Sequence, residues 1–176
     1  MTEYKYFLTC PGGFENLLMK ELESLGIFNA SESRGGVYFD ASFEEGMNVC
    51  LWTRLGGRLL LQLKNFEAET EKDIYNAAVS AEWDKWFSTD KSIFIDATAV
   101  GTNFRNTSYL SLLVKDGIAD YFRKKTDMRP SVSKENPDIR INLFVDKGEA
   151  VLSLDMSGNS LHQRGYRIEK TEAPIK

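Results

Sequence analysis

The order of strand-like and helix-like segments in the first 66 residues constrains the fold of this chain more than any other feature of its sequence. Four stretches are rich in apolar and aromatic residues, as β-strands are, and two carry apolar residues at helical spacing. The segments alternate as strand, helix, strand, strand, helix and strand over residues 4–10, 14–25, 27–34, 36–40, 43–54 and 58–66. This order predicts a split βαβ, or ferredoxin-like, domain.

Each helix of this domain carries a row of apolar residues, which is expected to form its buried face. The apolar rows are Phe14, Leu17, Leu18, Leu22 and Leu25 in the first helix, and Phe43, Met47, Val49, Cys50 and Leu51 in the second. Glycines follow both helices and provide their stop signals.

A charge-rich stretch at 67–72 separates this domain from a region with a different pattern. The expected elements of that region are short helices at 71–80 and 83–87, a strand at 92–99, a long helix at 107–125, a proline-containing loop at 128–138, and a hairpin of strands at 139–145 and 150–155. In the hairpin turn, Gly148 suits a left-handed backbone position.

These patterns predict an α+β protein with two domains, at 1–66 and 67–156. The first is ferredoxin-like and the second is an α/β domain. Residues 157–176 show no helical or strand period, are rich in basic residues and glycine, and are interpreted as a linker to a further domain downstream.

Two packing features of the second domain can be read from the sequence. Trp83, Trp86 and Phe87 could form a stacking platform for a ligand, but aromatic residues at spacings of three and four favour a buried cluster. Gly117 lies inside the long helix, where glycine costs about 1 kcal/mol relative to alanine. Its presence indicates a close packing contact.

Polar and basic residues gather where the strand at 92–99 gives way to the long helix. The group consists of Thr102, Asn103, Arg105, Asn106 and Thr107. A helix N-terminus offers unpaired N–H groups and a partial positive charge, which suits a phosphate, and an arginine there can bind phosphate or stack on a base. The structural alternative is an ordinary helix cap with a solvated arginine.

The distribution of charge favours a polyanionic partner for the second half of the chain. The net charge of the chain is −4. Residues 1–98 carry 9 Lys and Arg against 16 Asp and Glu, a net charge of −7, whereas residues 99–176 carry 13 against 10, a net charge of +3. Within that half, Arg140 is expected to project from the sheet, opposite the face formed by Ile139, Ile141 and Leu143.

Several functional classes leave no trace in the sequence. Glycine-rich dinucleotide or nucleotide loops, a GxSxG elbow and an HExxH metal motif are absent. Cys10, Cys50 and His162 lie far apart, so neither a metal site nor a disulfide framework is expected, and a reduced, cytoplasmic setting fits. Apolar runs fall far short of the roughly 20 residues of a membrane span. The residues alone indicate a binding module without catalytic residues.

Several motifs resemble those of a known family. They are the segments 104–109, 114–118, 129–130, 136–140, 152–158, 161–167 and 173–176. With them the chain resembles the N-terminal region of the bacterial 23S ribosomal RNA guanine-N2 methyltransferases, which contain a THUMP domain. That family is often labelled as DNA adenine methylases because of its catalytic motif. The resemblance covers essentially the whole chain, and its most specific part is 161–167 followed by 173–176.

The resemblance implies that residues 67–156 form a THUMP domain that binds structured RNA, most simply 23S ribosomal RNA. Residues 102–107 with Lys115 would face the RNA, and the loop with Arg129 and Lys134 would extend this surface. A catalytic domain that uses S-adenosylmethionine would follow residue 176. Its Asn-Pro-Pro-Tyr motif is missing here, so this chain is expected to bind RNA and not to methylate it.

Two alternatives remain open. The same THUMP module serves transfer-RNA enzymes, including thiouridine synthases and guanine methyltransferases, so tRNA is an alternative partner. A ferredoxin-like regulatory domain that binds a small metabolite is an alternative of a different class, and it would require a pocket and no salt-sensitive affinity for RNA.

Overall fold

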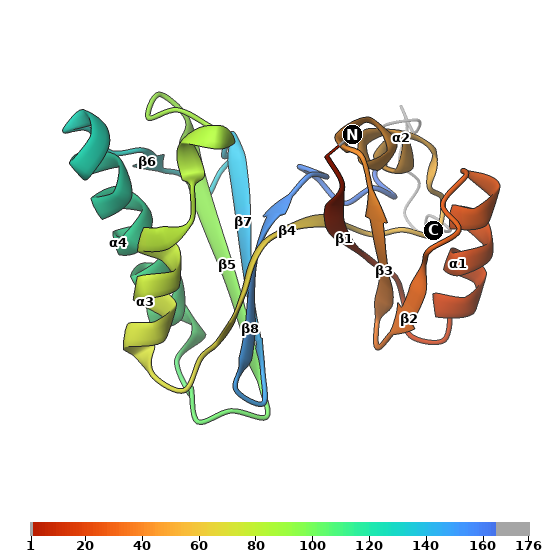
Figure 1. The fold of residues 1–176 in the computed structure, drawn as a ribbon, viewed down its shortest axis with the longest axis horizontal. Coiled ribbons are helices and arrows are strands. Elements are labelled where there is room, and N and C mark those ends of the chain that lie inside the picture. The colour runs from red at the N-terminus through yellow and green to blue at the C-terminus, as the bar shows by residue number, and fades with distance from the viewer. Residues whose placement is uncertain (1, 165–176) are drawn as a thin grey trace, which may run out of the picture.

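A computed structural model describes residues 2–164 and shows a single eight-stranded sheet covered by helices on one face (Figure 1). The strand order is β2-β3-β1-β4-β8-β7-β5-β6. The elements are β1 Tyr4–Thr9, α1 Glu15–Ser24, β2 Ser31–Ser33, β3 Gly36–Ala41, α2 Phe43–Trp52, β4 Leu59–Glu67, α3 Glu71–Ser80, the 3₁₀ helix η1 Trp83–Lys85, β5 Ser92–Val100, α4 Thr107–Thr126, β6 Ser131–Val132, β7 Ile139–Asp146 and β8 Glu149–Asp155. The predicted α+β class is confirmed.

The first part of the sheet has the ferredoxin-like arrangement. Strands β1 and β3 lie at its centre and pair antiparallel, with β2 and β4 outside them. The side chains of Tyr6, Leu8, Val37 and Phe39 are buried on the face that α1 and α2 cover. Helix α2 begins with a capping box, in which Ser42 and Glu45 bond reciprocally to each other's backbone N–H groups.

The second part of the sheet is built around β5, which pairs parallel with β7 and β6. The hairpin β7–β8 turns at Lys147 and Gly148, whose φ angles are both positive, at 50° and 93°. Helices α3 and α4 bury their apolar faces on the sheet, and Figure 1 shows them at the opposite end of the molecule from α1. The predicted left-handed role of Gly148 is confirmed.

The long strand β4 joins the two parts of the sheet. Its first residues, Leu59–Leu61, pair with β1, and it pairs with β8 from Leu60 to Glu67. The register shifts between Gln62 and Lys64, which marks a bulge. Main-chain pairing therefore runs without interruption from one half of the molecule to the other.

The described part of the expected linker, residues 157–164, lies against the first half. The Leu59 N–H donates to Ser157 Oγ at 2.7 Å, and the Leu161 N–H donates to the Gly57 carbonyl at 2.8 Å. Arg164 Nη2 donates to the Thr53 carbonyl at 2.7 Å. The rest of the segment, including the last three residues of the motif at 161–167 and all of 173–176, lies outside the described residues.

The aromatic cluster after α3 is a core element, as predicted. Trp83 is fully buried and its Nε1 donates to the Ala78 carbonyl at 2.7 Å. Phe87 is also buried and contacts Phe122 of α4. Trp86 is half-buried against Tyr4, with ring centroids 5.7 Å apart.

The structure corrects several local expectations. In place of a strand over 27–34, only Ser31–Ser33 pairs in the sheet, and the expected loop at 128–138 contributes the short strand β6. Five apolar residues expected on the buried faces of α1 and α2 are instead exposed, namely Phe14, Leu17, Phe43, Met47 and Leu51. Each helix rests on the sheet through a narrower stripe, because a ten-residue helix presents few positions to one flat face. No helix within residues 2–164 combines the length and hydrophobicity required to cross a membrane.

Candidate nucleic-acid interface

A cleft of about 570 Å³ lies between α4 and the segment around β6. Three cationic side chains line it: Lys115 and Arg123 from α4, and Arg129 from the loop that follows. The rest of its lining comprises Ile93, Asp116, Ala119, Pro130, Ser131 and Val132. Two of the predicted binding residues, Lys115 and Arg129, therefore meet at one place.

Helical geometry explains why α4 supplies two of these cations. Lys115 and Arg123 are eight residues apart, with Ala119 between them, so all three lie along one side of the helix. The opposite side is anchored by buried residues that include Leu110, Val114 and Tyr121. Because Ala119 is small, the surface between the two long cationic side chains is hollow.

The turn after α4 places the third cation. The helix ends at Thr126, and the next residue, Asp127, has a left-handed φ of 57°. Pro130 is buried and fixes the start of β6, which pairs parallel with the beginning of β5. Arg129, immediately before it, is exposed at the edge of the cleft.

The cations of the cleft are only weakly neutralised. Lys115 Nζ lies 2.8 Å from Asp116 Oδ1, and Arg123 Nη1 lies 3.2 Å from Asp120 Oδ1, both in solvent-accessible pairs. Such exposed pairs are worth about 0–1 kcal/mol, so a phosphate can replace the carboxylate. Arg129 forms no ion pair with any residue between 2 and 164.

Asp120 has a second, structural role beside the cleft. The Tyr75 hydroxyl of α3 donates to Asp120 Oδ2 at 2.7 Å. This bond, followed by the contact with Arg123, lowers the pKa of Asp120 below its usual value. The carboxylate thus stays charged, ties α3 to α4, and orients the Arg123 guanidinium.

The residues at the start of α4 lie away from the cleft, because the helix separates Thr107 from Arg123 by more than four turns. Asn106 is the N-cap, and its Oδ1 accepts from the Tyr109 N–H at 3.1 Å, as the structural alternative predicted. Thr102 Oγ1 accepts from the Phe104 N–H at 3.2 Å, within the same loop. Asn103 and Arg105 are exposed and available to a ligand.

The remaining two predicted residues occupy other surfaces. Lys134 is exposed in the loop between β6 and β7. Arg140 lies on the helix-free face of the sheet, with its guanidinium carbon 5.5 Å from the centre of the Phe94 ring, a cation–π contact. The structure thus gathers Lys115 and Arg129 and leaves Arg105, Lys134 and Arg140 apart.

Arg123 is the cleft residue that sequence reasoning missed. Its position in the run 123–125 is explained equally well by the dipole at the end of a helix. The spacing of Lys115, Ala119 and Arg123 indicates that they share one side of a helix. It does not predict a cleft, because the opposite wall is formed by β6.

Together, the ferredoxin-like half and the helix-covered half with its cationic cleft define a two-part α+β protein with a surface suited to a polyanion. The chain belongs to the THUMP domain family. The model of the THUMP domain matches residues 68–155, and that of the RlmL ferredoxin-like domain matches residues 5–60.

Relatives extend this similarity over nearly the whole chain. A protein of Pseudomonas fluorescens named ribosomal RNA large subunit methyltransferase K/L is 44% identical over 98% of this chain. The chain spans 23% of that protein's length.

Solved structures show the same fold. A predicted N6-adenine-specific DNA methylase from Listeria monocytogenes has a TM-score of 0.87 at 23% identity, covering all of this chain and 46% of its own. The putative methyltransferase SMU.472, solved with SAH, has a TM-score of 0.84 at 22% identity, over 96% of this chain and 45% of its own.

Proposed function

We propose that this chain is the RNA-binding, substrate-recognition part of an S-adenosylmethionine-dependent 23S ribosomal RNA (guanine-N2) methyltransferase. The observation that carries the proposal is the convergence of Lys115, Arg123 and Arg129 around one cleft in the THUMP half. The relatives named as ribosomal RNA methyltransferases support the choice of RNA. Ribosomal RNA as substrate also assigns the protein to the cytoplasm.

The cleft suits contact with the backbone of structured RNA. Its cations are spread over α4 and the following loop, so they can follow successive phosphates of one strand. RNA helices are recognised largely through phosphates and 2′-hydroxyl groups, because their deep major groove is closed to side chains. The three cations of the cleft would provide the phosphate contacts and the backbone of β6 would lie beside the ribose.

The surface we propose is larger than the cleft. At the start of α4, Arg105 with Thr102, Asn103, Asn106 and Thr107 would form a second contact, and Lys134 would add a cation in the loop after β6. Arg140 would provide a separate contact on the helix-free face of the sheet. A ligand that reached both ends of α4 would span about 30 Å, since a helix rises 1.5 Å per residue and α4 has 20 residues. An RNA hairpin stem is long enough to do so.

The methyl donor does not fit the part of the chain that the structure describes. S-adenosylmethionine enzymes of the Rossmann-like type bind their ligand in a crevice at the carboxyl ends of parallel strands. Here the sheet is mostly antiparallel, and the parallel strand β5 leads into the exposed loop 101–106. We therefore assign the methyl-donor site to another part of the longer protein. We also propose that residues 1–66 and 67–156 form two separate domains.

A salt titration of RNA binding tests the proposal. Fluorescence anisotropy would measure the affinity of the 176-residue chain for a labelled RNA hairpin and for a DNA duplex of the same sequence, between 50 and 200 mM salt. We expect the RNA to bind more tightly and log K to fall linearly with log salt. Competition with 23S ribosomal RNA fragments and with tRNA then separates the two RNA classes.

A matched pair of variants locates the surface. Arg129→Gln removes a cation from the cleft, and Lys20→Gln removes one from the exposed side of α1. Both change the net charge equally, but only Arg129→Gln should reduce the salt slope, by about 0.7–0.9. Equal slopes for the two variants, or no RNA binding at 50 mM salt, would refute the proposal.

A further inference from the structure

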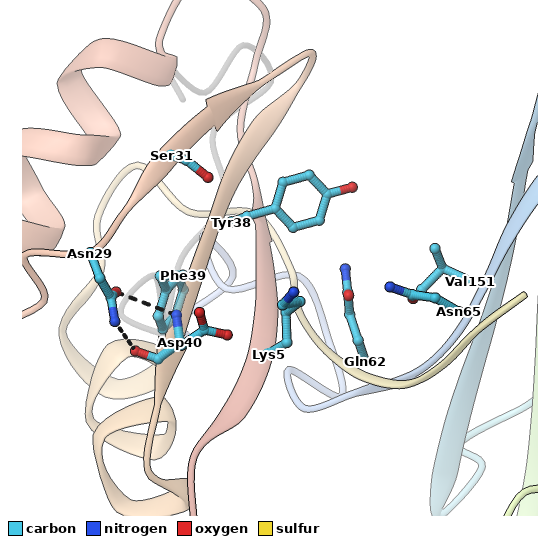
Figure 2. A pocket seen from close by; sticks show the side chains of 9 residues that line it. All are labelled: Lys5, Asn29, Ser31, Tyr38, Phe39, Asp40, Gln62, Asn65 and Val151. Atoms are coloured by element: carbon cyan, nitrogen blue, oxygen red, sulfur yellow. Dashed lines mark hydrogen bonds between the residues drawn. The ribbon is translucent and has the colours of Figure 1, made fainter.

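The helix-free face of the sheet contains a hollow of about 330 Å³ where the two halves meet. We call it the seam hollow. Its side chains come from both halves: Lys5, Tyr38 and Asp40 from β1 and β3, and Gln62, Asn65 and Val151 from β4 and β8 (Figure 2). Its volume falls within the roughly 300–1,000 Å³ of small-ligand sites.

An aromatic pair lies at one side of the seam hollow. Phe7 of β1 and Tyr38 of β3 are direct partners in the antiparallel register, on the face opposite the buried Tyr6 and Phe39. Their ring centroids are 4.6 Å apart. Both side chains remain partly exposed, so the Tyr38 ring, which projects into the hollow in Figure 2, has a free surface.

Gly36 allows the Phe7 ring to lie close to the sheet. A β-carbon at Gly36 would lie 2.6 Å from Phe7 Cζ, which leaves no room for a side chain there. The Phe7 ring therefore lies across the glycine backbone and supports the Tyr38 ring from one side. The two residues form a fixed platform on the central strands β1 and β3.

Amide groups face this platform from β4. Gln62 Oε1 is buried and has no hydrogen-bond partner among residues 2–164. Unsatisfied buried acceptors are rare in native proteins, because losing water without a replacement donor costs free energy. Asn65, beyond the bulge in β4, places a second amide at the same hollow, and this one is exposed.

The charges of the seam hollow favour a base over a duplex backbone. Lys5 and Asp40 are partners in the register of β1 and β3, so the one cation of the lining is offset by a carboxylate. Asn29 also lines the hollow, and its side chain forms two hydrogen bonds with the Asp40 backbone, at 2.8 and 3.3 Å (Figure 2). A near-neutral site with an aromatic platform and two amides suits a flat, polar, uncharged group.

We propose that the seam hollow binds one unpaired nucleotide of RNA. Its base would stack on Tyr38, its Watson–Crick edge would bond with the exposed amide of Asn65, and its phosphate would contact Lys5. Four-stranded βαββαβ sheets that bind single-stranded RNA stack bases on aromatic residues of their open face, because unpaired bases expose both faces and edges. This inference rests on the proposed RNA-binding function and adds a single-stranded element to the substrate.

The test compares two RNA hairpins with the same stem, one blunt and one with a single-stranded extension, binding to the 176-residue chain. We expect the extension to increase affinity, and Tyr38→Ala to remove about tenfold or more of that gain without changing affinity for the blunt hairpin. Tyr38→Phe, which keeps the ring, should retain most of the gain. Trp52→Ala removes an exposed aromatic side chain from α2, on the covered side of the sheet, and should leave the gain in affinity unchanged.

A crosslinking measurement on the unmodified chain covers the case in which Tyr38→Ala fails to fold. With 4-thiouridine in the extension, irradiation should attach RNA to the peptides that contain Phe7 or Tyr38, as mass spectrometry would show. Crosslinks confined to other peptides would overturn the inference.

The outcomes separate this inference from the proposed function. Equal affinity for both hairpins, or a gain that Tyr38→Ala leaves intact, would overturn the seam hollow alone. Binding of the extended hairpin only, through Tyr38, would support the hollow and contradict the proposed role of the cleft. Binding of neither RNA would overturn both. Self-association that Tyr38→Ala abolishes, without any effect on RNA, would make the hollow a contact between copies of the chain.

Discussion

Gly117 of α4 faces Ala78 of α3 so closely that a β-carbon on the glycine would lie 2.6 Å from the Ala78 Cβ. The same atom would lie 3.0 Å from the Tyr75 carbonyl oxygen and 3.1 Å from the Val79 nitrogen. The main chain of α3 therefore forms the wall of this contact. The close packing that the sequence predicted at Gly117 is confirmed, and it sets the distance between the two helices.

We expect Gly117→Ala to destabilise the fold by about 1–2 kcal/mol. Alanine gains about 1 kcal/mol of helix propensity, but overpacking against a rigid backbone costs about 1–3 kcal/mol or more. Urea unfolding would measure the change, with Lys124→Ala on the exposed side of α4 as a near-neutral control. A more stable Gly117→Ala variant would mean that α3 and α4 separate easily.

Trp83→Ala should destabilise the protein by about 3–5 kcal/mol, as the loss of a large buried aromatic side chain does. Trp83 is fully excluded from solvent, and its removal would also leave the Ala78 carbonyl without the hydrogen bond from Trp83 Nε1. Trp52→Ala is the control, because Trp52 is 63% exposed. Thermal unfolding followed by circular dichroism would compare them, and similar melting temperatures for both variants would contradict the core assignment.

Arg105→Ala should weaken RNA binding severalfold without loss of stability. The Arg105 side chain is exposed at the start of α4, where a phosphate would also meet the positive end of the helix dipole. Asn106→Ala provides the contrast, since loss of the cap should lower stability by about 0.5–2 kcal/mol. Anisotropy and thermal melts of both variants separate the loss of an RNA contact, which is expected for both, from the loss of the helix cap, which is expected only for Asn106→Ala. Unchanged affinity in Arg105→Ala would restrict the RNA surface to the cleft.

The contribution of Asp84 to stability should disappear in acid. Lys125 Nζ donates to Asp84 at 2.8 Å and the Tyr121 hydroxyl donates to it as well, which lowers the pKa of Asp84. A carboxyl group with a lowered pKa stabilises the fold above its unfolded pKa of about 3.9 and loses this effect as the pH falls through the folded value. The same contacts raise the pKa of Lys125, so its charge persists throughout this range.

The melting temperatures of the natural chain and Asp84→Asn should therefore differ most near neutral pH and converge below about pH 4. Other carboxylates with lowered pKa values, such as Asp120 and Asp138, are present in both proteins and cancel in the difference. A difference that stays constant from pH 7 to about pH 2.5 would show that the Asp84 charge has no role.

Local pattern was sufficient for most of the fold. The helices, the strands, the turn at Gly148 and the contact at Gly117 follow from periodicity and from the backbone freedom of glycine, which act within a few residues. The apolar rows of α1 and α2 were less reliable. Leu17 and Met47 have helical spacing with buried neighbours, yet which residue of a row touches the sheet depends on the rotation of the helix against it.

The candidate sites depended on partners distant in sequence. The amino-acid pattern was enough to predict the order of elements, the ferredoxin-like class and the basic character of the second half. The packing of the folded chain brings Arg123 and Arg129 to one cleft with Lys115, and Tyr38 and Gln62 to one hollow. The pairing of β4 with β8 depends on many weak contacts between segments that are far apart in the sequence. A local sequence pattern therefore cannot predict it.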